Sequence, residues 1–285
     1  MALPPPEFAT YLAHVRSGAS PDEGFSLNPT PPRAPLTQRE LAAAVGWSLG
    51  YVTQLEQGRA KNPSERLVED LAAALQLTQT ETEHLHALRA APRIPNSSPE
   101  TKGVATAELA DTVDEFARLE VPAAVVTEAW DVVHANRVFV RLFRGVTDRN
   151  TANILKWLFF AQEARVILRD WEREARLTVA WLRWNWARRP RMGAFPRVLD
   201  SLSDSPEFAG WWGRQELARR RHTSELRVRD LDTGQDLTLR AAVLDPDPTV
   251  PVQLFQAIPT AGTSDGVADA AQHQPLVSAA GLGGR

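Results

Sequence analysis

The stretch from Leu36 to Gly58 constrains the fold more than any other part of the chain, because it marks the ends of two short helices. Thr37 and Glu40 have the spacing of a capping box, which starts a helix. Gly46 stands where a helix end needs a positive φ, and Ser48 can cap a second helix directly afterwards. The stretch therefore predicts two helices joined by a tight turn.

The apolar residues of this stretch recur at helical spacing and predict its inner face. They are Leu41, Ala44 and Val45 in the first helix and Val52 and Leu55 in the second. Trp47, inside the turn, is expected to be buried against the first helix. A helix pair inside an ordinary globular domain could share this pattern, but the agreement of both caps with the apolar spacing favours a helix-turn-helix. In that motif the second helix enters the DNA major groove.

The same stretch resembles the phage-repressor-like (XRE) class of helix-turn-helix proteins in Gln38, in the turn 46–48 and in the ending 54–59. The resemblance implies that Gln38 touches a phosphate, that the start of the second helix reads bases, and that basic residues after it contact the backbone. The implied DNA-binding residues are Gln38, Arg39, Ser48, Leu49, Gly50, Thr53, Gln54, Arg59 and Lys61. Gln54 stands where the most similar subgroup has Arg, which is the main reader of guanine.

Length and composition indicate an ordinary two-domain protein. The chain has 285 residues, 43% hydrophobic and 24% charged residues, and no cysteine, which excludes disulfides and thiol chemistry. It has no apolar run long enough to cross a membrane and no signal-peptide pattern at its start, so we expect a cytoplasmic protein.

The charge of the motif predicts weak DNA binding by a single copy. The net charge is −3, and residues 36–63 carry three basic residues against two acidic ones. Phosphate contacts supply most of the non-specific affinity for DNA. We therefore expect a homodimer on a pseudo-palindromic site in double-stranded DNA.

Breaks in composition divide the chain into four parts. Helices are expected at 7–16, from Ser64 and from Gln79, around the motif, with a Pro-rich loop before it. The Pro- and Ser-containing segment 91–102 reads as a linker. We predict a helix-turn-helix domain at 1–90, a linker at 91–103, a second domain at 104–259 and a disordered Gly- and Ala-rich tail at 260–285.

The second domain mixes strands and helices. Strands are expected at 123–127, 130–134, 224–229, 236–243 and 250–258, and helices around Val113 and at 136–143, 152–160, 163–188, 194–202 and from Ser205. This arrangement predicts an α+β domain in which a small antiparallel sheet carries a helical layer.

A second resemblance covers residues 5 to 260. It rests on the order of Val121-Pro122-Ala123, Trp130-Asp131-Val132, Asn136, Arg149-Asn150, Trp171 with Arg176, Leu182-Arg183, Ser205-Pro206-Glu207-Phe208 and Trp211-Trp212. This order is similar to that of MmyB-type regulators. The resemblance implies a lambda-repressor-like all-α helix-turn-helix domain followed by an α+β PAS-like domain that holds a small apolar ligand such as a fatty acid. Gln215 and the segment after Arg221 depart from the family, which has His and His-Pro there.

Eight of the nine tryptophans lie between Trp130 and Trp212. Large rigid aromatic rings line apolar ligand pockets, although they also fill ordinary cores. The implied ligand-binding residues are Trp130, Asn136, Trp157, Phe160, Trp171, Trp181 and Trp212. The arginines at 214 and 219–221 could hold a ligand carboxylate or lie on a solvated helix face.

We expect neither an enzyme nor a cofactor or metal site. The chain contains no GxSxG, HExxH or phosphate-binding loop, and His84 and His86 lack the i, i+4 spacing of a metal pair. The sequence therefore predicts a sequence-specific, ligand-responsive transcription regulator. The alternative is a DNA-binding protein whose second domain only dimerises or recruits a protein partner.

Overall fold

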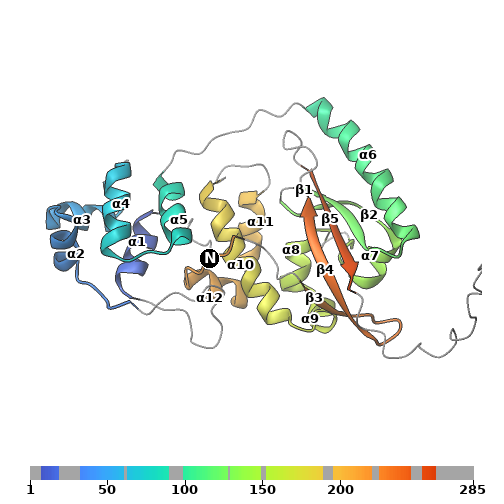
Figure 1. Cartoon of the computed structure of the whole chain (residues 1–285). Helices are drawn as coiled ribbons and strands as arrows, with labels where there is room; N and C mark the ends of the chain where they lie inside the picture. Colours follow the sequence, from blue (N-terminus) through green and yellow to red (C-terminus); the bar gives the residue numbers. More distant parts are fainter. Residues whose placement is uncertain are drawn as a thin grey trace, which may run out of the picture.

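The computed structural model describes residues 8–18, 33–60, 63–89, 99–127, 129–148, 152–188, 195–219, 225–244 and 252–260. Five N-terminal helices form one end of the molecule and a sheet with its covering helices forms the other, with α10, α11 and α12 between them (Figure 1). The α+β fold predicted from the sequence is confirmed. Lys61 and the tail 261–285 lie outside the described residues.

The five N-terminal helices lie where the sequence predicts them, and two of them begin at the predicted caps Thr37 and Ser48. They are α1 (Phe8–Arg16), α2 (Gln38–Val45), α3 (Leu49–Glu56), α4 (Glu65–Ala74) and α5 (Gln79–Arg89). Thr37 and Glu40 form the complete capping box of α2, and Gly46 ends that helix at φ 70°. The Ser48 side chain accepts from the Tyr51 backbone at the start of α3. The caps therefore fix the turn between α2 and α3, as predicted.

The apolar core of these helices is closed without the turn tryptophan. Leu41, Val52 and Leu55 are almost completely buried. Trp47 is 37% exposed, stacks on Tyr51 at 5.3 Å between ring centroids, and directs its Nε1 towards Asp70 of α4 at 3.4 Å. The prediction of a buried Trp47 is wrong, because the smaller side chains already fill the space between the helices and the ring lies at the surface.

The second domain contains a five-stranded antiparallel sheet in the order β2-β1-β5-β4-β3. The strands are β1 (Ala123–Thr127), β2 (Val132–Ala135), β3 (Leu226–Arg229), β4 (Asp236–Leu244) and β5 (Val252–Pro259). β1 pairs with β5 from Ala123 opposite Gln256 to Thr127 opposite Val252. All five predicted strands are confirmed, with ends shifted by a few residues. The chain therefore returns to its first strand only at its last one.

Helices cover the sheet on both faces. They are α6 (Pro99–Arg118), α7 (Arg137–Leu142), α8 (Ile154–Phe160), α9 (Gln162–Ile167), α10 (Trp171–Arg188), α11 (Phe195–Leu202) and α12 (Pro206–Gly213). On one face, Val113 of α6 packs with Ala123, Val125 and Leu254 (Figure 1). On the other face lies the main core, to which β1 and β5 contribute Val126 and Phe255, among others. α6 begins at Pro99, which lies inside the stretch predicted to be a linker. Within the described ranges, no helix is long and apolar enough to span a membrane.

The single helix predicted over 163–188 is wrong, because the chain breaks at Leu168. This residue has an extended backbone at φ −81° and ψ 111° and forms an isolated antiparallel bridge with Val228 of β3. The Arg169 backbone also donates to the Arg227 carbonyl at 3.0 Å. Pairing of Leu168 and Arg169 with the edge strand β3 replaces the helical hydrogen bonds at this point, so α9 and α10 are two separate helices.

Replacing Trp47 with Ala is expected to lower the free energy of unfolding by about 1–2 kcal/mol, because only part of the ring's apolar surface is buried. A fully buried Trp would cost about 3–5 kcal/mol. Chemical denaturation of the full chain followed by circular dichroism measures the difference. Trp47→Phe keeps the stacking on Tyr51 and serves as the matched control. A loss of helical signal in Trp47→Ala under native conditions would contradict this placement of the ring.

Candidate DNA-reading face and ligand cavity

The start of α3 carries the solvent-facing side of the helix-turn-helix. Ser48, Leu49, Gly50 and Gln54 are exposed, while Val52 and Leu55 of the same helix face the core. Since helical neighbours three and four residues apart share a face, the exposed positions form one continuous surface. This face has the shape and composition that a recognition helix needs for contact with base edges.

Two arginines flank this face and are available to phosphates. Arg39 at the start of α2 and Arg59 after α3 are exposed, and within the described residues neither forms an ion pair. Glu40 beside Arg39 is held in the capping box, where hydrogen bonds from Thr37 lower the pKa of its carboxyl. The acidic group of the first turn is therefore engaged locally.

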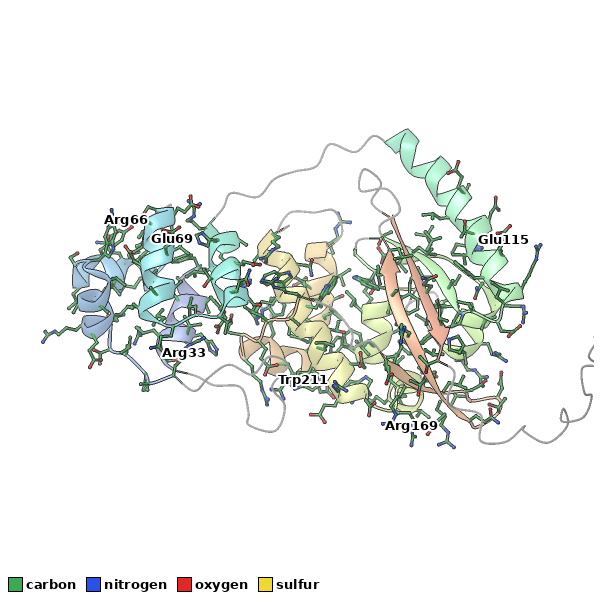
Figure 2. All side chains as sticks on the ribbon, in the orientation of Figure 1. Arg33, Arg66, Glu69, Glu115, Arg169 and Trp211 are labelled. Carbon is green, nitrogen blue, oxygen red and sulfur yellow. The ribbon has the colours of Figure 1, made fainter. Side chains whose placement is uncertain are left out.

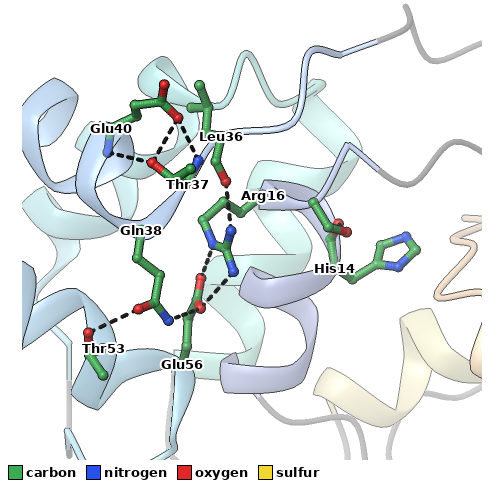
Figure 3. Close-up of polar contacts among 9 residues, drawn as sticks. His14, Arg16, Leu36, Thr37, Gln38, Glu40, Thr53 and Glu56 are labelled. Carbon is green, nitrogen blue, oxygen red and sulfur yellow. Dashed lines mark hydrogen bonds and ion pairs between the residues drawn. The ribbon is translucent and has the colours of Figure 1, made fainter.

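A half-buried polar network fixes α3 against α1 and α2 (Figure 3). Glu56 accepts from Gln38 Nε2 at 2.7 Å and forms a bidentate ion pair with Arg16, whose second hydrogen bond is 3.0 Å long. Thr53 Oγ1 donates to Gln38 Oε1 at 3.1 Å, and Arg16 also donates to the Leu36 carbonyl at 2.6 Å. Gln38 uses one of its two N–H groups in this network, so the other can still reach a phosphate.

The network assigns positioning roles that the sequence did not reveal. Arg16 and Glu56 are forty positions apart in the chain, and although Glu56 lies in the ending of the motif, the sequence does not show that it pairs with Arg16. Gln38 and Thr53, predicted to contact DNA, are half-buried and partly engaged by their neighbours. The orientation of these two side chains is therefore set by the ion pair between Arg16 and Glu56.

A cavity with an interior of about 40 Å³, or about 450 Å³ of empty space when its open mouth is included, lies in the second domain between the sheet and helices α7, α8 and α10. Its wall consists of Phe139, Phe143, Val146, Ile154, Trp157, Leu158, Leu168, Glu174, Thr178, Leu226 and Phe255. Nine of these eleven side chains are apolar, so the cavity favours an apolar guest. The two polar ones, Glu174 and Thr178, lie one turn apart on α10.

Aromatic contacts hold the cavity wall in place. Trp157 Nε1 donates to the Arg144 carbonyl at 2.8 Å, and its ring meets Phe143 edge-on at 5.9 Å. Phe255 of β5 lies edge-on to both Phe139 and Phe143, at 5.6 and 6.1 Å. Thr178 donates its hydroxyl to the Glu174 carbonyl at 2.7 Å, which leaves the hydroxyl oxygen able to accept. The wall is thus preorganised, with an acceptor on its α10 side.

Of the seven residues predicted to bind ligand, Trp157 lines this cavity and the other six do not. Trp130 is buried against Trp181 at 5.6 Å, and Phe160 is 45% exposed. Trp171 donates to the Leu158 carbonyl at 2.8 Å and packs near Trp211. These rings support the core and the helix contacts around the cavity instead of its wall.

The remaining two predicted residues serve the backbone or a buried charge. Asn136 caps α7 by accepting from the Phe139 backbone, and its amide donates to the Val113 and Val121 carbonyls at 2.9 Å each. Trp212 stacks on Phe208 and lies 4.3 Å from the guanidinium carbon of Arg183. Asn136 therefore ties α6, β1 and α7 together, and Trp212 shields a buried cation.

Most of the actual wall residues carry no signal in the sequence. Phe139, Val146, Leu226 and Phe255 have the spacing of ordinary core positions, and only the fold brings them together. Within the described ranges, no group of three or more His, Asp or Glu side chains is placed to hold a metal ion.

Comparison with protein-family models finds one match for each half of the chain. Residues 7–85 match a helix-turn-helix domain model, and residues 105–270 match the MmyB-like transcription regulator ligand binding domain. The chain belongs to the MmyB-like transcription regulators. No curated protein matches it. Both halves were anticipated by the two resemblances seen in the sequence, and the cavity lies within the matched ligand-binding domain.

Changing Gln54 to Ala is expected to relax base preference by about 1–3 kcal/mol at one position, because the side chain lies on the exposed face of α3. Changing Arg59 to Ala should instead weaken binding to all sequences and reduce the salt slope by about 1, as for a phosphate contact. Selection of binding sites from random DNA, followed by salt-dependent affinity measurements, separates the two effects.

Gln162→Ala, an exposed Gln-to-Ala change in α9, is the matched control and should leave DNA binding unaltered. If the Gln54 variant selects the same site with unchanged affinity, Gln54 does not face the bases.

Proposed function

We propose that this transcription regulator senses a small apolar, fatty-acid-like molecule in the cavity of its PAS-like second domain and reads a pseudo-palindromic operator as a homodimer. The observation that carries the proposal is the composition of the cavity wall, in which nine apolar side chains face two polar residues of α10. An alkyl chain gains about 25 cal/mol for each Å² that it removes from water against such a wall. The Thr178 hydroxyl donates to the Glu174 carbonyl, so its oxygen can accept from a head group that carries a proton, such as a neutral carboxylic acid or an alcohol.

The DNA side of the proposal rests on the exposed face of α3 and on its sparse positive charge. One motif offers Arg39 and Arg59 as exposed phosphate-binding groups. Two motifs in a dimer double the number of phosphate contacts and read two half-sites. A cytoplasmic location belongs to the same proposal, since a regulator must share a compartment with its DNA.

We further propose a regulatory role without catalysis. The polar groups of the cavity are a carboxyl and a hydroxyl one helical turn apart, a pair suited to orienting a guest. The competing proposal is a second domain that only dimerises or recruits a protein. The two proposals differ in whether occupation of the cavity changes operator affinity.

Replacing Val146 with Phe is expected to fill part of the cavity and lower the affinity for lauric acid at least tenfold. Val146 is buried in the cavity wall, and a Phe there competes for the space of the alkyl chain. Overpacking should cost about 1–3 kcal/mol of stability, which a folded domain tolerates. Titration of lauric acid against intrinsic Trp fluorescence gives the affinity, and operator binding with and without the acid gives the coupling.

Val166→Phe, the same substitution at an exposed position on α9 away from the cavity wall, is the matched control. It should bind lauric acid like the unaltered protein. Equal affinities in the two variants would place the ligand elsewhere. An operator affinity that no fatty acid changes would favour the dimerisation or partner-binding alternative.

A further inference from the structure

The helix-turn-helix domain docks onto α10 of the second domain through α5. His84 of α5 is completely buried between Tyr11 of α1, whose ring is 4.7 Å away, and Trp184 of α10, whose ring lies nearly parallel at 6.2 Å. Leu217, after α12, belongs to the same buried apolar cluster as Leu85 of α5. We call this contact between α1, α5, α10 and Leu217 the joint. It makes one residue of the second domain part of the core of the first.

Charged groups surround the joint. Arg219 forms an ion pair with Glu83 at 2.6 Å, and Arg188 donates to the Glu83 carbonyl at 3.3 Å while its guanidinium carbon lies 3.2 Å from the ring centre of Trp184. Arg183, one position before Trp184 on α10, is completely buried, and the loss of hydration lowers the pKa of its guanidinium to about 9. The joint therefore combines one aromatic stack with a rim of cationic groups that face Glu83.

The joint is also incompletely satisfied. Among the described residues, no hydrogen-bond partner is found for either ring nitrogen of His84 or for the Nε atom of Arg183. Burial and the neighbouring guanidinium groups of Arg183 and Arg188 lower the pKa of His84, so the ring stays neutral near pH 7. Buried polar atoms without partners are rare and oppose burial. A contact built in this way holds less firmly than the apolar cores on either side of it.

The same helix reaches the cavity. Glu174 and Thr178 of α10 line the cavity wall, and Trp184 and Arg188 of α10 lie in the joint. Six residues separate Thr178 from Trp184, which is about 9 Å along a helix. A continuous helix transmits a shift or rotation at one end to the other over that length. The position of α10 is thus common to the cavity and to the docking of the helix-turn-helix domain.

We propose that the joint is a reversible contact through which occupation of the cavity, by way of α10, sets the orientation of the helix-turn-helix domain. This inference rests on the proposed function in one respect, which is that the cavity binds a ligand. In Figure 1, α3 lies at the far end of the molecule from the sheet, while α5 faces α10. Docking therefore leaves the DNA-reading face open and changes the geometry of the two half-site readers in a dimer.

The joint is tested by charge exchange in the full chain. Glu83→Arg and Arg219→Glu each place like charges together and should lower the docked population several-fold, whereas the double exchange restores opposite charges and should recover most of it. Arg144→Glu breaks the exposed pair with Asp232 in the second domain and is the matched control. Far-UV circular dichroism shows that each variant is folded.

Spin labels at Glu69 of α4 and Glu115 of α6 report the docked population by double electron–electron resonance. Both residues are exposed and lie at opposite ends of the molecule (Figure 2), and the chain has no native cysteine to interfere. Labelled protein is mixed with excess unlabelled protein, so that distances within one chain are measured. Single exchanges that leave the distance distribution unchanged would overturn the reversible joint, as would a double exchange no better than the singles.

Coupling to the cavity is tested without reliance on a ligand. Val146→Phe, which fills the cavity, should change the docked population at least twofold, and the exposed control Val166→Phe should not. Lauric acid, added to the unaltered protein, should shift the distribution in the same direction as Val146→Phe. An unchanged distribution in Val146→Phe overturns the coupling, even if lauric acid binds. A failure of lauric acid to bind overturns the fatty-acid proposal alone, since the side-chain experiment still decides the coupling.

Discussion

Burial of charge along α10 is the constraint on which the arrangement of the whole molecule depends. Eleven of the eighteen residues of α10 are buried, which is more than one helix face, so the helix must be covered from several sides. Arg176 and Arg183 are among them, and a buried guanidinium is stable only with partners. Arg176 forms a bidentate ion pair with Glu216 that is itself almost completely buried. Arg183 donates to the Trp212 carbonyl and to Gln215 at 2.8 Å.

These partners come from the last turn of α12 and the short segment that follows it. Gln215 adopts φ 56°, a left-handed conformation that costs energy for a residue with a side chain. The turn lets Gln215 reach Arg183 and Glu216 reach Arg176, while Leu217 enters the apolar cluster of the helix-turn-helix domain. Two buried arginines of α10 therefore fix the segment that presents Leu217. The Gln215 amide satisfies the Arg183 guanidinium without adding a titratable group.

The sequence predicted what is decided by local rules. The capping box of Thr37 and Glu40 and the left-handed Gly46 fixed the boundaries of α2 and α3, and β-branched runs marked the strands. The break at Leu168 could not be predicted, because Val228 competes for it from sixty positions away while the local pattern stays helical. The cavity wall could not be predicted either, because it also depends on contacts between distant parts of the chain. Phe139 and Phe255 have the sequence pattern of core residues, and only the fold places them beside a cavity. Counting tryptophans identified the domain and, of the wall residues, only Trp157.

The insertion of Leu217 into the core of the N-terminal helices has a consequence for engineering. Modular regulators are often treated as interchangeable parts that can be cut at a linker and recombined. Here a residue beyond position 200 completes the packing of the first module, and His84 of that module is covered by Trp184 of the second. A chimera that keeps the sensor and takes a foreign reader needs a matching α5 surface, or it will leave Leu217 without an apolar cluster to pack into. The boundary between reader and sensor therefore runs through the protein interior, where α5 meets α10.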